Sequence, residues 1–163
     1  MIITRSAGAL DARAMAELLN EIIAAGGTTA LTSAVTRTDI QDRMAANPDR
    51  SAWHVTEDET GELLGFQWIA PHPELPPDAA DIATFVRMGK TGLGTGSRLF
   101  QASSAAARKM GYAWINATIR ADNEGGLAYY QSQGFEDYKI LRDIALGNGL
   151  VVDKLCKRFD LLI

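Results

Sequence analysis

Apolar residues recur at two spacings along the 163-residue chain, one helical and one extended. Between residues 10 and 25 they return every three or four positions and end at Gly26, which predicts an amphipathic helix. The apolar stripe of this helix would consist of Leu10, Ala14, Leu18 and Ile22, widened by Leu19 and Ile23. Segments 52–57 and 62–70 flank a turn cluster at 58–61, so together they predict a β-hairpin.

The remaining patterns complete a mixed order of strands and helices. Strands are expected over 2–6, 81–87, 113–119, 137–142 and 150–159, and further helices over 36–46, 97–109 and 123–133. The resulting order, β-α-α-β-β-β-α-β-α-β-β, predicts a single α/β (α+β) domain over 1–163 with one mainly antiparallel sheet. A rigid surface loop is expected at 71–77, which holds four of the five prolines.

Composition narrows the classes of function. The 16 basic and 20 acidic residues give a net charge of −4, which argues against a general nucleic-acid binder. The chain has no run of apolar residues long enough to span a membrane and no export signal at its start, so we expect no membrane partner. A single cysteine, Cys156, cannot form an intrachain disulfide, which favours a cytoplasmic location. With two histidines and one cysteine, no zinc-type ligand cluster is expected.

The segment from Phe85 to Phe100 has the pattern of a strand, a glycine-rich loop and a helix. Glycines at 92, 94 and 96 let the backbone turn tightly and point several N–H groups the same way. The helix that follows adds unpaired N-terminal amides and the positive end of its dipole. Local positive charge comes from Arg87, Lys90 and Arg98. Together these features predict an anion site, most often one for phosphate.

Four interpretations of this loop compete. A Walker loop fails, because Thr84 and Phe85 stand where its first glycine should precede Lys90. A dinucleotide fingerprint fails as well, because its third glycine would fall at Ser97 or Leu99. The loop could instead hold the pyrophosphate of coenzyme A, or it could be a turn that only joins the strand to the helix.

A second motif follows the strand expected at 113–119. It contains Asn123, Ala128, Tyr130 and the pair Gly134-Phe135. Together with Gly94-Thr-Gly96 and the helix after it, this motif resembles the GNAT superfamily of acyl-CoA-dependent N-acetyltransferases, and the order of elements matches over nearly the whole chain. The resemblance implies a mainly antiparallel sheet of about seven strands flanked by about four helices.

Within the superfamily the chain looks most like the phosphinothricin and methionine-sulfoximine acetyltransferases, which act on L-amino acids. The matching segments are Asn20-Glu-Ile-Ile, Thr28-Thr29, a carboxylate at Asp81 and the tail 147–161. Two positions depart from the pattern. The glutamine or arginine at the head of the loop is Thr91, and the usual glutamate on the fourth strand is Asp81, one methylene shorter.

The resemblance also implies how acetyl-CoA would be held. Backbone groups of Phe85, Val86 and Arg87 would pair with the pantetheine arm like an added strand, and Asn123 would contact the arm near its thiol end. The pyrophosphate would bind the backbone amides of Gly92, Leu93, Gly94, Thr95, Gly96 and Ser97.

Two residues are candidates for proton transfer. By resemblance, Tyr130 would contact the cosubstrate and protonate the leaving sulfur, and Asp81 would take a proton from the amine, directly or through water. A backbone N–H of the fourth strand would polarise the thioester oxygen. Plainer interpretations stay open, in which Tyr130 is a packed aromatic and Asp81 a solvated acid. A structural or exposed role is the better expectation for His54, His72, Tyr129, Cys156 and the tryptophans Trp53, Trp68 and Trp114.

The function implied is an N-acetyltransferase that moves an acetyl group from acetyl-CoA to a primary amine of a small molecule, an amino acid or an analogue. Attack would be direct, within a ternary complex. Alternative acceptors are a protein N-terminus or a lysine. Outside catalysis, the chain could be a non-catalytic acyl-CoA sensor, or a binder of ATP or NAD. By analogy with the family we expect a homodimer, and we expect no metal and no nucleic-acid partner.

Overall fold

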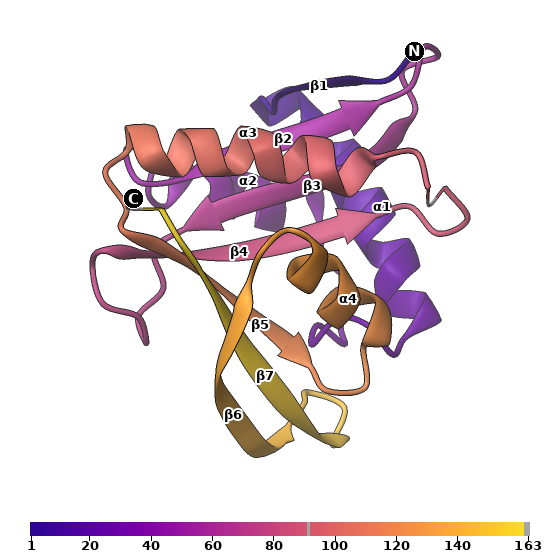
Figure 1. Ribbon diagram of the computed structural model, residues 1–163. Coiled ribbons are helices and arrows are strands. Elements are labelled where there is room, and N and C mark those ends of the chain that lie inside the picture. The colour runs from indigo at the N-terminus through magenta and orange to yellow at the C-terminus, as the bar shows by residue number, and fades with distance from the viewer. Residues whose placement is uncertain (91, 162–163) are drawn as a thin grey trace.

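The computed structural model describes residues 1–90 and 92–161 (Figure 1). Its strands are β1 Ile3–Ser6, β2 Ala52–Glu57, β3 Leu63–Ala70, β4 Ala79–Val86, β5 Trp114–Arg120, β6 Glu136–Ala145 and β7 Val151–Asp160. Its helices are α1 Ala12–Ala25, α2 Arg37–Ala45, α3 Thr95–Lys109 and α4 Glu124–Ser132, with a short 3-10 turn at Ala9–Asp11. The predicted order of strands and helices is confirmed.

One sheet carries all seven strands in the order β1-β2-β3-β4-β5-β7-β6. Neighbouring strands are antiparallel except β4 and β5, which run parallel, so the mixed, mainly antiparallel fold is confirmed. The parallel pair is short: its register runs from Ala79 opposite Trp114 to Asp81 opposite Asn116. Beyond that point β4 and β5 diverge, as Figure 1 shows, and we call this opening the fork.

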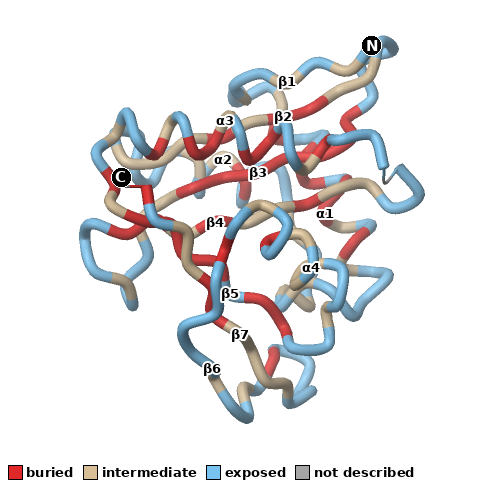
Figure 2. The backbone as a smooth tube through the Cα atoms, viewed as in Figure 1, coloured by how far each residue is buried: buried red, intermediate tan, exposed pale blue. Residues whose placement is uncertain are grey.

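Helices cover both faces of the sheet. In Figure 1, α3 crosses the front of the sheet and α1 and α2 lie behind it. The rear core contains Met15, Leu19, Trp53, Phe66, Trp68 and Phe85, and the front core contains Ile82, Phe100, Ile115, Tyr130 and Phe135. Figure 2 shows this burial concentrated on the middle strands, whereas β6 is exposed along most of its length.

The predicted stripe of α1 is partly wrong. Leu10 is 99% exposed and Ala14 is also exposed. The α-helix begins only at Ala12, after the 3-10 turn, and its buried face is set by Ala12, Met15, Leu19 and Ile22. Those residues follow the helical repeat at three- and four-residue steps. At the N-terminal end, the buried face therefore points in a different direction around the helix axis from the predicted one.

The bounds of two other elements matter for the site. Helix α3 begins at Thr95, two residues before the predicted start, so Gly96 lies in its first turn. Strand β4 begins at Ala79, which makes Asp81 the third residue of a sheet strand rather than its first. Among the described residues, no helix is long and apolar enough to cross a membrane.

Candidate active site

Asp81 and Asn116 mark the closed end of the fork, because they form the last paired position of β4 and β5. Side chains alternate between the faces of a strand. Asp81 therefore lies on the same face as Ala83 and Phe85, which pack into the rear core. Thr84 lies on the opposite face, where its hydroxyl contacts Tyr130 of α4. The two predicted proton-transfer residues thus approach the fork from opposite faces of the sheet.

The backbone of β4 corrects one part of the predicted cosubstrate contact. The Arg87 N–H donates to the Leu64 carbonyl over 2.7 Å. The Phe85 carbonyl also points at β3, since it would lie 2.8 Å from a Cβ built on Gly65. Backbone polar groups alternate between the two neighbours of a strand, so Val86 faces the fork. Of the three residues expected to pair with a pantetheine arm, the backbones of Phe85 and Arg87 are committed to β3.

The loop after β4 ends in an uncapped helix terminus. Gly92 and Gly94 have φ values of +81° and +77°, which favour glycine. Gly94 is the N-cap of α3 and provides no side-chain hydrogen bond to the first turn. Arg98 N–H donates to the Gly94 carbonyl, so regular helical bonding starts there. The amides of Thr95, Gly96 and Ser97 precede that bond and have no hydrogen-bond partner among residues 1–90 and 92–161, so this end of a 15-residue helix is suited to an anion. The predicted loop residue Thr91 lies outside the described residues.

Gly96 has a different role from the one that the loop pattern suggests. It is helical, and a Cβ added there would lie 2.5 Å from Cε1 of Tyr129. The Tyr129 hydroxyl donates to the Gly96 carbonyl over 2.7 Å. The missing side chain therefore lets α4 pack directly on the first turn of α3. Burial raises the pKa of Tyr129 to about 12, so its phenol is neutral at physiological pH.

Tyr130 is almost completely buried, with 7% of its surface exposed. Its hydroxyl lies 2.7 Å from Thr84 Oγ1, and the ring packs edge-on against Phe135. Burial raises the pKa of Tyr130 well above its ordinary value, so the phenol holds its proton at physiological pH. Such a group can donate a proton but cannot act as a base at neutral pH.

Asp81 is half-buried and held by Asn116, whose Nδ2 donates to Asp81 Oδ1 over 2.9 Å. Burial raises the pKa of Asp81 above its ordinary value, while the hydrogen bond from Asn116 and the nearby side chains of His72 and Arg43 oppose that rise. Asn116 Oδ1 in turn accepts a hydrogen bond from the Tyr138 hydroxyl. A carboxylate with a raised pKa is a stronger base than one in water, so this position fits proton abstraction.

The segment after α1 is tied to the start of α4. Asn123 Oδ1 accepts from the Gly126 N–H as the N-cap of α4, and Asn123 Nδ2 donates to the Thr28 carbonyl. Both polar atoms of Asn123 thus have protein partners, and its contact with a pantetheine arm stays a prediction. Arg120, which is 6% exposed, donates to the Thr29 carbonyl over 3.0 Å.

The other candidates take the structural roles expected of them. Trp53, Trp68 and Trp114 are buried, and Cys156 is buried in β7. His54 is partly buried, and burial lowers its pKa, so its imidazole is neutral at physiological pH. His72 is exposed in the proline loop, where its Nδ1 accepts from the Glu74 N–H. Among the described residues, no group of three metal-ligating side chains is present.

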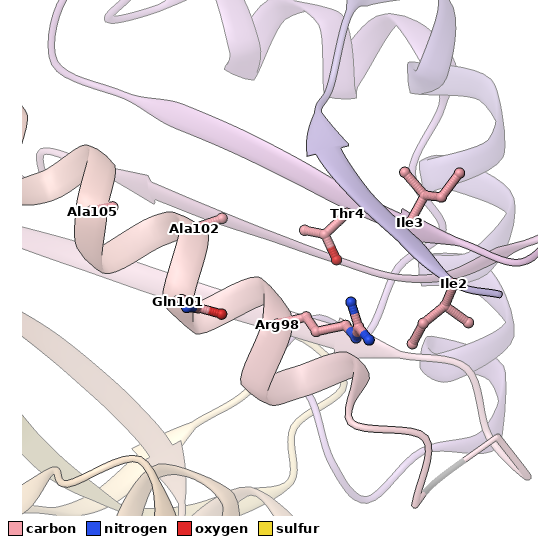
Figure 3. Close-up of a pocket in the computed structure, with 7 residues that line it drawn as sticks. All are labelled: Ile2, Ile3, Thr4, Arg98, Gln101, Ala102 and Ala105. Carbon is pink, nitrogen blue, oxygen red and sulfur yellow. The ribbon is translucent and has the colours of Figure 1, made fainter.

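Two hollows of the surface lie away from the fork. One has a volume of about 510 Å³ and runs between the first strand and α3, and Figure 3 shows Arg98 reaching into it opposite Ile2 and Thr4. The other, of about 440 Å³, borders the glycine loop at Lys90 and Leu93. Neither touches Asp81 or Tyr130.

Comparison with known proteins agrees with this geometry. The model of the acetyltransferase (GNAT) family matches residues 14–135. The chain belongs to the GNAT family. That match runs from α1 to the end of the Gly134-Phe135 pair, so it includes β4, the fork, the uncapped end of α3 and α4.

Individual GNAT relatives resemble the chain to different extents. A mycothiol acetyltransferase of Paenarthrobacter aurescens (strain TC1) is 34% identical over 106 residues, which are 62% of this chain but only 32% of that protein. YwnH of Bacillus subtilis (strain 168), provisionally named a phosphinothricin acetyltransferase, is 26% identical over 156 residues, 94% of this chain and 91% of that one. The phosphinothricin acetyltransferase Pat of Sinorhizobium meliloti, solved in complex with acetyl-CoA, has the same fold: TM-score 0.87, 17% identity, 98% of this chain and 88% of that one.

Four polar residues of the site escaped the sequence interpretation. Asn116 and Gln67 are buried in β5 and β3, Thr84 lies in β4, and Tyr138 lies in the edge strand β6. Their signal in the sequence is weak: each is a polar residue within a strand pattern. A buried polar residue needs a partner, which is itself a hint of a network, but the pattern does not say which partner.

Proposed function

We propose that this GNAT chain is an acetyl-CoA-dependent N-acetyltransferase whose acceptor is the primary amine of a small molecule. One observation carries the proposal: the fork opens at the uncapped end of α3, with Asp81 reaching it from one face and Tyr130 from the other. A phosphate-bearing thioester could thus lie with its anion on the helix end and its acyl group between a base and an acid.

The described residues fit the cosubstrate. The amides of Thr95, Gly96 and Ser97 would hold the pyrophosphate, and the free backbone edge of β4 at Val86 would pair with the amides of the pantetheine arm. Asn123 stays a proposed contact near the thiol. Acetyl-CoA supplies an acetyl group that is activated as a thioester.

The chain's own residues would handle two protons. The amine nitrogen of the acceptor forms a bond to the thioester carbon, and the carbon–sulfur bond breaks. Asp81, directly or through one water, takes the proton that the attacking nitrogen loses. Tyr130 gives its phenolic proton to the departing sulfur. No covalent intermediate on the chain is needed, since all reacting groups can meet in one ternary complex.

The choice of a small acceptor rests on similarity to known proteins and on the position of Asp81. YwnH and Pat are both named for phosphinothricin, an amino-acid analogue. In this chain, Asp81 lies on the face that also carries α1 and α2, and the segment 26–34 between these helices is tied to Arg120 and Asn123. That tie puts the segment against the open end of the fork, and we infer from it a preference for a compact amine over a protein chain.

Two further expectations remain proposals. A homodimer would cover the exposed apolar residues of the last hairpin, where Ile140, Leu150 and Val151 are 50%, 48% and 56% exposed. A cytoplasmic location would keep Cys156 as a free thiol.

The test has two stages. Thermal unfolding is measured with acetyl-CoA, coenzyme A, ATP and NAD in parallel, because a ligand that binds only the folded state raises the midpoint. Release of free thiol is then followed with phosphinothricin, L-methionine sulfoximine and other amino acids as acceptors. We expect shifts with the two coenzyme A species only, and turnover that falls about 100-fold or more in Tyr130→Phe. A shift with ATP or NAD alone would overturn the proposal, and binding without turnover of any amine would leave an acyl-CoA sensor.

A further inference from the structure

A buried chain of hydrogen bonds leads to the Tyr130 hydroxyl from the opposite side of the fork. Gln67 of β3 is completely buried, and its Nε2 donates to Thr84 Oγ1 over 2.8 Å. Thr84 Oγ1 lies 2.7 Å from the Tyr130 hydroxyl. Three elements, β3, β4 and α4, therefore meet at one threonine, three positions beyond the last paired residue of β4.

The Gln67 amide is fixed by a second bond. The same Nε2 donates to the Tyr129 hydroxyl over 3.0 Å, and that hydroxyl donates to the Gly96 carbonyl. Both Nε2 hydrogens are therefore used. If the amide were turned over, its oxygen would have to accept from Thr84 and Tyr129, and Tyr129 could no longer donate to Gly96. The bond to Gly96 thus sets Gln67 as a donor toward Thr84.

The direction of the next bond follows from the hydrogens available. A threonine hydroxyl has one hydrogen, and a phenol has one. Among the described residues, Thr84 is hydrogen-bonded to Gln67 and Tyr130, and Tyr130 to Thr84 alone. The Tyr129 hydroxyl also lies near Thr84, but it already accepts from Gln67. If Tyr130 donated to Thr84, the threonine hydrogen would be left unpaired in the protein interior, at a cost of a lost buried bond. If Thr84 donates, the free hydrogen is that of Tyr130, and it remains available at the fork.

We propose that Gln67 and Thr84 are positioning residues that orient Tyr130: the chain Gln67→Thr84→Tyr130 occupies a lone pair of the phenol oxygen and leaves its O–H pointing to the leaving sulfur. This inference rests on the proposed function, in which Tyr130 is the general acid. With the thioester bound, only this direction of the hydrogen bonds gives an acceptor to the hydroxyl hydrogens of both Thr84 and Tyr130.

The same chain also eases the proton transfer. The hydrogen bond from Thr84 lowers the pKa of Tyr130 against the larger rise caused by burial. After the phenol has lost its proton, Thr84 still donates to the phenolate, and Gln67 still donates to Thr84. Chains of aligned donors polarise one another, so the stabilisation is greater than that of one isolated bond.

The experiment measures kcat and KM for acetyl-CoA with the amine found in the acceptor screen, in four variants. Thr84→Val keeps the shape but removes the hydroxyl, and we expect kcat to fall about tenfold, part of the 100-fold or more at stake in acid catalysis, with KM changed less than about twofold. Thr84→Ser restores the donor and should recover most of kcat. Gln67→Leu should lower kcat in the same way. Thr56→Val is the matched control, because Thr56 is a buried threonine on the same face, bonded to Thr4 rather than to the site.

A second set of variants separates this inference from the function on which it rests. In a Tyr130→Phe background, Thr84→Val should cause no further loss of kcat, since nothing remains to be oriented. An equal loss in both backgrounds, or full activity of Thr84→Val beside an impaired Tyr130→Phe, would overturn the positioning role alone. Full activity of Tyr130→Phe itself would overturn the assignment of the acid. If Thr84→Val does not fold, Gln67→Leu in both backgrounds decides the question.

Discussion

Asn116 Nδ2 lies 2.9 Å from Asp81 Oδ1, across the last paired position before β4 and β5 separate. The bond joins the carboxylate to the residue that closes the fork. Oδ1 of Asp81 is thereby held by Asn116. In the proposed mechanism, the other oxygen of Asp81 would take the amine proton, and the Tyr138 hydroxyl donates to Asn116 from its other side.

Asp81→Asn should raise stability at neutral pH while it lowers activity. Burial raises the folded-state pKa of Asp81, so its favourable contribution to folding is present below the ordinary pKa of 3.8 and is lost as the pH rises through the folded-state value. An asparagine removes the buried charge and still accepts from Asn116. We expect Asp81→Asn to have the higher Tm at pH 7, with the difference closing toward pH 3, as checked by thermal unfolding across that range.

The same variant tests the base. If Asp81 accepts the amine proton, kcat/KM falls about 100-fold or more in Asp81→Asn, and the acidic limb of the pH profile disappears. In the wild type that limb should lie above the ordinary value of an aspartate, in the direction of the raised pKa. An unchanged pH profile in Asp81→Asn would mean that water or another group, rather than Asp81, accepts the proton of the amine.

Gly96→Ala should loosen the contact between α3 and α4. The added Cβ would lie 2.5 Å from Tyr129 Cε1, so one helix has to shift, at a cost of about 1–3 kcal/mol. Denaturant unfolding measures this cost, and calorimetry should show weaker coenzyme A binding. Gly125→Ala in α4 is the control: its nearest atom would be 3.9 Å away, and alanine favours a helix, so stability should stay equal or rise. Equal stability of the two variants would contradict the role given to Gly96.

Arg120→Met should release the segment between α1 and α2. Arg120 is nearly buried and links the Thr29 carbonyl to Asp122, so its loss leaves a carbonyl without its charged donor. A cost of about 1–3 kcal/mol is expected. Hydrogen exchange at residues 26–34 should rise, and KM for the amine should rise more than KM for acetyl-CoA. Arg142→Met removes an exposed ion pair to Asp153 and should change none of these quantities.

The sequence predicted the order of elements and the glycine loop because each has a local signal, whereas Tyr130 and Asp81 were named only through the resemblance to the GNAT family and their roles stay predictions. Gly92 and Gly94 are needed for positive φ, and the apolar period defines a helix or strand without knowledge of its neighbours. Asn116 and Gln67 have no such signal. Their roles depend on partners 35 and 17 residues away, Asp81 and Thr84, which meet only when the sheet forms. Leu10 shows that a local signal can also mislead. It fits the apolar period, but a 3-10 turn precedes the α-helix and leaves Leu10 exposed.

Ser97→Asp separates the anion site from helix stability, because the two respond with opposite sign. Ser97 lies in the first turn of α3, where a carboxylate interacts favourably with the helix dipole and should add about 0.3–1 kcal/mol of stability. The same charge competes with a pyrophosphate for those amides, so coenzyme A should bind at least tenfold more weakly. Ala105→Asp adds an equal charge eight residues along the same helix, about 12 Å away, where salt screens it. Calorimetry at 0.1 M salt should show near-normal binding in that control, and equal weakening in both variants would indicate a general charge effect rather than a site at the helix end.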